Sequence, residues 1–170
     1  MLDKNFKPDD ISPTFCAEPF EHIATSTSGH YKLCCRSFDT ETKVSEVDYE
    51  EWFNGSYMKE VRRKMLAGEK VKNCEVCYAA ERNGYPSTRQ RMQKHQFRLD
   101  IENPRPPSVD LRPNNVCNLR CATCGPKNSS SHAKEKYGKN IHFVEDMSFS
   151  RERIDPIAAD LRHVYLAGGE

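Results

Sequence analysis

Eight cysteines constrain this 170-residue chain more than any other feature of its sequence. The opening segment, MLDKNFKPDD, lacks the apolar core of a signal peptide, so we expect a cytoplasmic protein. Disulfides are rare in that reducing compartment, and clustered cysteines there usually bind metal. The sequence therefore predicts a metal-binding protein whose candidate ligands are Cys16, Cys34, Cys35, Cys74, Cys77, Cys117, Cys121 and Cys124.

Charge and hydropathy exclude several other classes of protein. The 26 lysines and arginines nearly cancel the 25 aspartates and glutamates, which leaves no strong overall field for a nucleic acid or a membrane surface. No apolar run is long enough to cross a membrane. Eight Phe, seven Tyr and one Trp remain to build a core. We expect a globular protein with neither membrane nor nucleic acid as a partner.

The first hundred residues predict a hairpin followed by helices. Residues 16–38 contain two β-like stretches around a Ser28-Gly29 turn, with cysteines near the open ends of the hairpin. Residues 48–67 look helical, with a helix start at Gly55-Ser56 after Trp52 and Phe53. Apolar positions then recur at helical spacing, and Gly68 is a plausible stop. The Cys74-x-x-Cys77 pair then leads into a short helix.

A further helix is expected from a Ser87 cap to about Phe97. It carries a run of positive charge. A solvated face is the expected role of this run, and a phosphate or nucleic-acid contact is the alternative. The residues concerned are Arg89, Arg91, Lys94, His95 and Arg98.

A proline-rich segment over residues 103–107 predicts a stiff linker. We therefore place a domain boundary there, between a cysteine-rich module over residues 1–102 and a second unit over residues 108–170. Few contacts are expected to cross such a segment.

The second unit has the pattern of a parallel β/α fold. Residues 108–112 alternate like a strand, a helix can start at one of the serines 129–131, and another helix is expected within 150–160. Residues 163–167 form a nearly continuous apolar run, typical of a strand that is buried on both faces. The predicted fold class is α/β, or α+β when the whole chain is considered.

The loop after the first of these strands carries Cys117, Cys121 and Cys124 in the spacing C-x3-C-x2-C. Three thiolates leave one position open at a metal centre, which suits a four-iron cluster that binds a further ligand. Structural zinc sites use four ligands, so a zinc site that borrows His132 is the alternative. The loop lies at the carboxyl end of its strand, where α/β folds place their chemistry.

The segment CNLRCATCGPKNSS resembles the cluster motif of the radical S-adenosylmethionine (radical SAM) superfamily, and Gly168-Gly169-Glu170 resembles its GGE motif. The resemblance implies a partial TIM-like barrel in which Cys117, Cys121 and Cys124 hold a [4Fe–4S] cluster. It also implies that Gly168, Gly169 and Glu170 contact the amino group of S-adenosylmethionine (SAM). The expected activity is that of a radical-generating oxidoreductase. Its partners would be an electron donor such as flavodoxin or ferredoxin and a peptide, protein or small-molecule substrate.

The N-terminal cysteines show a second resemblance. The spacing C-x12-G-x4-C from Cys16 to Cys34, followed by CEVCYAAERNGYPSTRQR, is similar to the SPASM and twitch modules of radical SAM enzymes. This implies an auxiliary [4Fe–4S] cluster on Cys16, Cys34, Cys74 and Cys77. Four thiolates suit zinc equally well, so zinc is the alternative. Cys35, next to Cys34, is expected to point away as a spare thiol.

The stretch from Ser108 to Glu170 is far shorter than the roughly 180 residues that six β/α units would take. We therefore expect the barrel to stop after its second strand, which leaves the strand at 163–167 with an open edge. The 170-residue chain is then expected to be catalytically inactive alone. A metal-stapled structural or binding module without catalysis is the alternative function.

Overall fold

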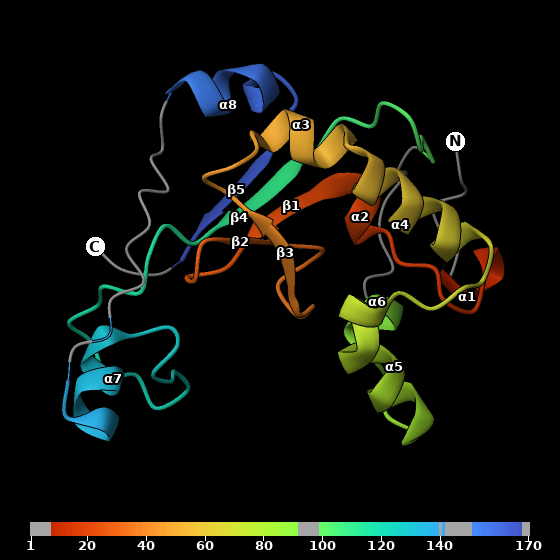
Figure 1. The fold of residues 1–170 in the computed structure, drawn as a ribbon. Helices are drawn as coiled ribbons and strands as arrows, with labels where there is room; N and C mark the ends of the chain where they lie inside the picture. Colours follow the sequence, from red (N-terminus) through yellow and green to blue (C-terminus); the bar gives the residue numbers. More distant parts are fainter. Residues whose placement is uncertain (1–7, 92–98, 140, 142–150, 168–170) are drawn as a thin grey trace.

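The computed structural model describes residues 8–91, 99–139, 141 and 151–167 (Figure 1). Its centre is a five-stranded mixed sheet with the order β3-β2-β1-β4-β5, and helices lie around it. The predicted mixed α/β class is thus confirmed. The strands are β1 (His22–Thr25), β2 (His30–Lys32), β3 (Asp39–Lys43), β4 (Ser108–Leu111) and β5 (His163–Leu166).

The predicted N-terminal hairpin is confirmed. β1 and β2 pair antiparallel, with Ala24 opposite Lys32, and Gly29 in the connecting turn has a φ of 77°. Glycine adopts this left-handed conformation without the steric cost that a side chain would bring. A third strand, β3, pairs antiparallel with β2 and was not predicted. Its sequence, DTETK, has no apolar residue to indicate a strand.

The stretch 48–67 is helical as expected, and it is divided at Gly55 into two helices, the second of which begins at Ser56 as predicted. A Cβ atom at position 55 would lie 2.8 Å from the carbonyl oxygen of Glu51, so the close approach of Gly55 to the last turn of the first helix favours glycine. Gly68, with a φ of 76°, ends the second helix as expected. The helices of this half are α1 (Pro8–Ile11), α2 (Glu18–Glu21), α3 (Tyr49–Asn54), α4 (Ser56–Leu66), the short 3-10 helix η1 (Lys72–Cys74), α5 (Glu75–Arg82) and α6 (Thr88–Arg91).

The second half contains α7 (Ser130–Tyr137) and α8 (Arg151–Ala158). Ser129 caps α7 by accepting a hydrogen bond from the amide of His132, and Gly138 ends it in the left-handed conformation, as the sequence predicts. Pro156 lies inside α8. In the part of the chain that the structure describes, no helix has the length and apolar character needed to cross a membrane.

One sheet joins the two predicted units. β4 runs parallel to β1, with Val109 opposite Ile23, and parallel to β5, with Val109 opposite Val164. The expectation that few contacts cross residues 103–107 is therefore wrong. Those residues connect segments that share a strand pairing and a core, and the ends of the units at 102 and 108 stay a prediction.

The main core lies between one face of the sheet and helices α3, α4 and α8 (Figure 1). Tyr31 of β2 stacks on Trp52 of α3 with 4.6 Å between the ring centroids. Burial of large aromatic and aliphatic side chains is the main stabilising contribution to such a layer. The sheet contributes Ile23, Tyr31, Val109 and Leu111, and the helices contribute Trp52, Phe53, Met58, Val61 and Ile157.

β5 lies at one edge of the sheet, as the length of the second unit predicts. Val164 and Leu166, which continue the apolar face of β4, are 57% and 62% exposed. The burial on both faces expected for this apolar run is thus not found. No strand follows β5 in the described sheet, so one side of its backbone is free.

Candidate metal sites

Four cysteines from three distant stretches of the sequence line one small cavity of about 20 Å³. Cys16 precedes α2, Cys34 follows β2, Cys74 ends η1 and Cys77 lies in the first turn of α5. These are the four N-terminal residues for which the sequence predicts a common site, and the structure brings them together. Their role as metal ligands stays a prediction.

A tight turn positions Cys34. The hydroxyl oxygen of Ser37 accepts hydrogen bonds from the amides of Leu33 (3.0 Å) and Cys34 (3.3 Å), and the Ser37 amide donates to the Cys34 carbonyl. Ser37 is buried and also lines the cavity. The turn therefore fixes the backbone of Cys34 at the end of β2.

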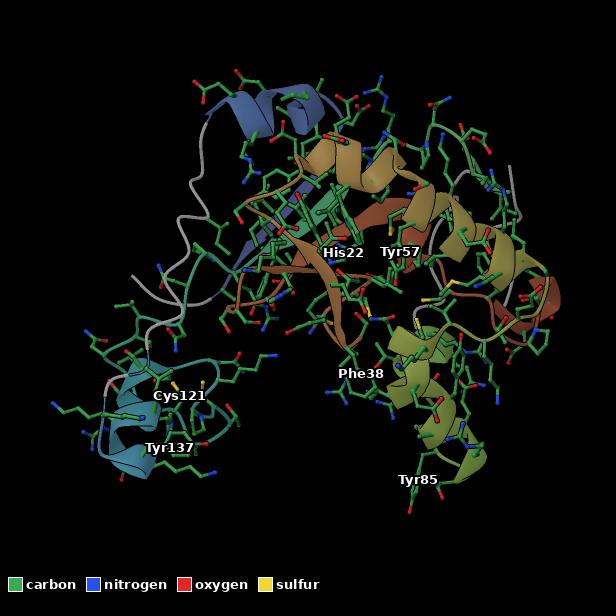
Figure 2. All side chains as sticks on the ribbon, in the orientation of Figure 1. His22, Phe38, Tyr57, Tyr85, Cys121 and Tyr137 are labelled. Atoms are coloured by element: carbon green, nitrogen blue, oxygen red, sulfur yellow. The ribbon has the colours of Figure 1, made fainter. Side chains whose placement is uncertain are left out.

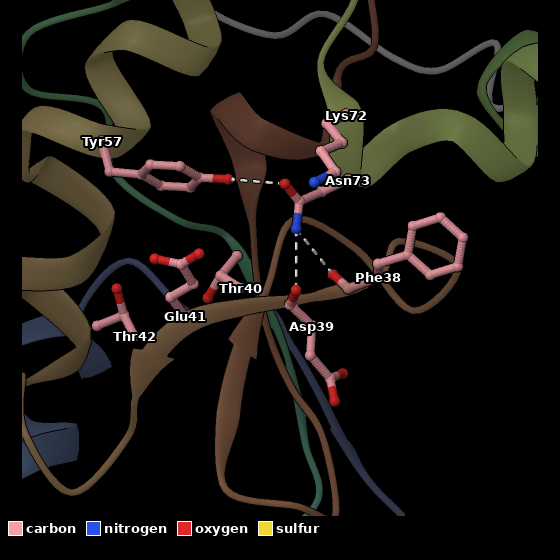
Figure 3. Close-up of a pocket in the computed structure, with 8 residues that line it drawn as sticks. All are labelled: Phe38, Asp39, Thr40, Glu41, Thr42, Tyr57, Lys72 and Asn73. Atoms are coloured by element: carbon pink, nitrogen blue, oxygen red, sulfur yellow. Dashed lines mark hydrogen bonds between the residues drawn. The ribbon is translucent and has the colours of Figure 1, made fainter.

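Asn73 positions the neighbouring Cys74 (Figure 3). Its side-chain amide nitrogen donates to the backbone carbonyl of Asp39 (2.9 Å), as Figure 3 shows. Its backbone carbonyl accepts from the backbone amide of Phe38 (2.9 Å). The hydroxyl of Tyr57 donates to the Asn73 side-chain oxygen (3.2 Å). Asn73 thus joins the turn that carries Cys74 to both β3 and α4.

These contacts form one wall of a groove of about 470 Å³ beside β3, the other edge strand of the sheet (Figure 3). Sequence reasoning missed this groove, because β3 was not predicted. The residues that line it are Phe38, Asp39, Thr40, Glu41, Thr42, Tyr57, Lys72 and Asn73.

Burial favours the protonated form of the Cys16, Cys34 and Cys74 thiols. It raises the pKa of Cys34 to about 11 and that of Cys74 to about 12, and it raises the pKa of Cys16 well above the ordinary value. The negative charge of neighbouring thiolates raises the pKa of Cys16 and Cys74 further. Any metal that binds these thiols must therefore displace their protons, and binding becomes stronger as the pH rises.

Arg89 of α6 lines the same cavity, and its side chain is only 4% exposed. It pairs with Asp9 (2.8 Å) and Glu81 (2.6 Å) and donates to the carbonyl of Phe15 (3.1 Å). The expected solvated face is therefore wrong for Arg89. The positions of Lys94, His95 and Arg98 lie outside the described residues.

The second group of cysteines lies on the loop that follows β4, as predicted. Cys121 is exposed, and Cys117 and Cys124 are partly exposed. Figure 2 shows Cys121 beside α7, on the opposite side of the view from α5 and Tyr85. The two groups of cysteines therefore form separate sites.

The first residues of α7 hold this loop through its backbone. The hydroxyl groups of Ser130 and Ser131 donate to the carbonyl of Cys117, and the Cys117 amide donates to Ser130. Ser129 donates to the carbonyl of Leu119 (3.0 Å). The thiols of Cys117 and Cys124 add only long contacts, to the carbonyls of Leu119 (4.0 Å) and Gly125 (3.9 Å).

His132 also contacts this loop. Its Nε2 atom lies 3.0 Å from the carbonyl oxygen of Cys121. A hydrogen bond there requires the proton on Nε2, which leaves Nδ1 as the atom that a borrowed zinc ligand would have to use.

The loop is also joined to the N-terminal hairpin. The hydroxyl of Thr27, in the β1–β2 turn, donates to the carbonyl of Lys127 (3.0 Å). The ammonium group of Lys127 pairs with Asp39 of β3 (2.8 Å). This pairing and the Ser28 hydroxyl, which donates to the same carboxylate, keep the pKa of Asp39 below its ordinary value despite partial burial.

The carboxyl ends of β4 and β5 lie side by side. Leu111 pairs with Leu166, and the amide of Ala167 donates to the Leu111 carbonyl (3.1 Å). The chain therefore leaves β4 toward the cysteine loop at the same end of the sheet at which β5 ends. Gly168, Gly169 and Glu170 themselves lie outside the described residues.

Cys35 is exposed, and burial of part of its surface raises the pKa of its thiol. It lies within electrostatic range of Asp110 and Arg112, which form a bidentate ion pair on β4 and just beyond it. Its expected role as a spare thiol stays a prediction.

The described residues contain no group of three or more histidine, cysteine or carboxylate side chains already arranged to hold a metal ion. The donor sets nevertheless fit metal groups in their chemistry. Four thiols share one cavity at the N-terminal site, and three thiols share one short loop at the other. No protein-family model matches the chain, and searches of the curated proteins and of the solved structures likewise found no match.

Proposed function

We propose that this chain carries the cluster-binding part of a radical SAM enzyme. The observation that supports this proposal is the position of the three-cysteine loop at the carboxyl end of β4, beside the end of the parallel strand β5. In α/β folds the chemistry lies at that end of the strands. β4, α7, α8 and β5 would be the first units of a partial TIM-like barrel.

In this proposal Cys117, Cys121 and Cys124 hold a [4Fe–4S] cluster. Once reduced by an external one-electron donor such as flavodoxin or ferredoxin, such a cluster would supply the electron for reductive cleavage of a carbon–sulfur bond of SAM. Gly168, Gly169 and Glu170 hold the methionine amino group of SAM through backbone and carboxylate oxygens. Ser130 and Ser131 hold the loop backbone, so that its thiols are free to turn toward the metal.

The N-terminal cysteines have a separate role. Cys16, Cys34, Cys74 and Cys77 hold either an auxiliary [4Fe–4S] cluster or a zinc ion. A cavity of about 20 Å³ holds about one water molecule. Binding a zinc ion therefore requires less rearrangement of the surrounding residues than binding a [4Fe–4S] cluster.

A metal-stapled module without catalysis is the second candidate function. The observation that favours it is the burial of the N-terminal site. Cys16 belongs to the main hydrophobic core and Cys74 packs against it, so a metal there would link β2, η1 and the core. Structural metal sites stabilise small folds in this way.

Anaerobic reconstitution of the chain with iron and sulfide tests the proposal. We expect the triple variant C117A/C121A/C124A to lose one cluster and C35A to lose none. SAM should change the electron paramagnetic resonance spectrum of the reduced wild-type protein and leave that of the triple variant unchanged. Iron that is lost only with the N-terminal cysteines, and a spectrum insensitive to SAM, would contradict the radical SAM proposal and favour the second candidate.

A further inference from the structure

The cavity of the four N-terminal cysteines is lined by a buried arginine, one N–H group of which lacks a hydrogen-bond partner among the described residues. Two arginines line this cavity. Arg36 is exposed, whereas the side chain of Arg89 is 4% exposed. A guanidinium group keeps its charge in proteins, so a buried arginine needs partners for its N–H groups.

The two terminal nitrogens of Arg89 have such partners. Nη1 donates to the carboxylate of Asp9 and to the carbonyl of Phe15, and Nη2 donates to the carboxylate of Glu81. These contacts come from α1, from the segment before Cys16 and from α5, and they fix the plane of the guanidinium group.

The third nitrogen, Nε, is buried and has no hydrogen-bond partner among the described residues. A buried N–H group without a partner costs about 1–3 kcal/mol. Such groups are rare in folded proteins and call for an explanation, such as an ion or ligand at that place. The atoms that share the cavity with Arg89 include four cysteine side chains.

We propose that Arg89 donates its Nε–H to a sulfur atom of the metal group held by Cys16, Cys34, Cys74 and Cys77. The inference rests on metal binding at that site and holds for zinc and for a cluster, because both present negatively charged sulfur. Arg89 is thus a positioning residue. Its N–H group reduces the negative charge on the sulfur atoms, and its ion pairs with Asp9 and Glu81 keep it in place.

Cadmium(II) titration of the metal-free, fully reduced 170-residue chain tests this role through the thiolate-to-cadmium absorption band. Every protein compared also carries C117A/C121A/C124A, so that the loop thiols add no band, and wild type here means unchanged at Arg89 and Arg62. Replacing a residue that hydrogen-bonds to a metal ligand typically changes metal affinity by about 10- to 100-fold. We expect a loss of this size for R89M. R89K keeps a positive charge but lacks Nε, and we expect it to remain weaker than the wild type by about 10-fold or more.

The matched control is R62M. Arg62 is an equally buried arginine, with no exposed surface, that donates to the carbonyls of Pro19, Phe53 and Ile101 and does not line the cavity. Its replacement should lower the stability of the fold but leave the cadmium affinity within about twofold. Equal affinities for wild type, R89M and R89K would overturn the role of Arg89. No cadmium band in the wild type would instead contradict the metal site itself.

A measurement on the wild type avoids any variant that fails to fold. With cadmium-113 and nitrogen-15 labels, the Arg89 Nε–H signal should move downfield on cadmium binding, exchange slowly with solvent and show scalar coupling to the metal through the sulfur. An Nε–H signal that is unchanged when cadmium is bound would overturn the proposal. A merely structural arginine would not give this coupling.

Discussion

The two groups of cysteines differ in what holds them. Cys16, Cys34 and the pair Cys74 and Cys77 come from three distant stretches of the chain and meet in a cavity against the core. The other three lie on one short exposed loop, which hydrogen bonds from the first turn of α7 fix in place. Tertiary packing therefore builds the first site, whereas local sequence builds the second.

This difference has a thermodynamic consequence. A metal at the first site links elements that are distant in the sequence, so its binding energy contributes to the stability of the whole fold. A metal at the second site closes only a loop, and the core does not depend on it. The exposed position of that loop instead leaves a metal there accessible to a ligand.

The largest expected effect separates the two sites through stability. In the zinc-loaded chain, replacing Cys16 and Cys74 by Ala should lower the free energy of unfolding by at least about 3 kcal/mol, because the metal and its link to the core are lost. C117A/C121A/C124A should change it by less than about 1 kcal/mol. Urea unfolding in the presence of zinc measures both. Equal losses for the two variants would show that the sites do not differ in this way.

In the metal-free chain, the free energy of unfolding should depend on pH through the buried thiols of the N-terminal site. The pKa of Cys34 rises from 9.0 to about 11 and that of Cys74 from 9.0 to about 12, so the folded state favours the protonated thiols. Their contribution to stability is complete below pH 9 and is lost as the pH rises toward 11 and 12.

We expect the wild type to lose about 2 kcal/mol more than C34A/C74A between pH 8 and about pH 9.7, measured by urea unfolding. Tyrosines that also titrate there affect both proteins alike, so the difference isolates the two thiols. A zinc-loaded wild type should not show this loss. Parallel pH profiles for the metal-free wild type and C34A/C74A would argue against buried thiols.

The serines of α7 should matter for the exposed site alone. S130A/S131A removes the hydroxyl groups that hold the Cys117 carbonyl, at about 1 kcal/mol for each hydrogen bond. Metal affinity of the loop should fall by about 10-fold, with little effect on the N-terminal site. Titration of a chain with Cys16, Cys34, Cys74 and Cys77 replaced measures the loop alone. S56A, at an exposed position, is the control, and equal effects of the two changes would contradict the role of the serines.

The smallest expected effect concerns Asn73. N73A removes the side-chain bonds to Asp39 and Tyr57 and should lower the free energy of unfolding by about 1 kcal/mol. It should also weaken metal binding at the N-terminal site, since Cys74 follows directly. N83A, which removes one local bond at the end of α5, is the matched control. Metal affinity that is unaffected by N73A would show that packing alone places Cys74.

The sequence predicted those parts of the fold that depend on neighbouring residues. The turn at Gly29, the serine cap and glycine end of α7, and the strands β4 and β5 all follow from local preferences and periodicity. The helix start at Gly55-Ser56 was also predicted, whereas the separate short helix α3 before it was not. β3 was missed because strand pairing, and not its polar sequence, makes it a strand.

By itself, the sequence determined the two groups of cysteines and the ligand chemistry that their thiols offer, because residue type and spacing carry that information. Only the tertiary structure decided that β1 pairs with β4 across residues 103–107 and that Arg89 is buried beside the N-terminal thiols. The physical reason is that strand order and burial depend on which distant segments pack together, and the free energy of that packing is shared by the whole core.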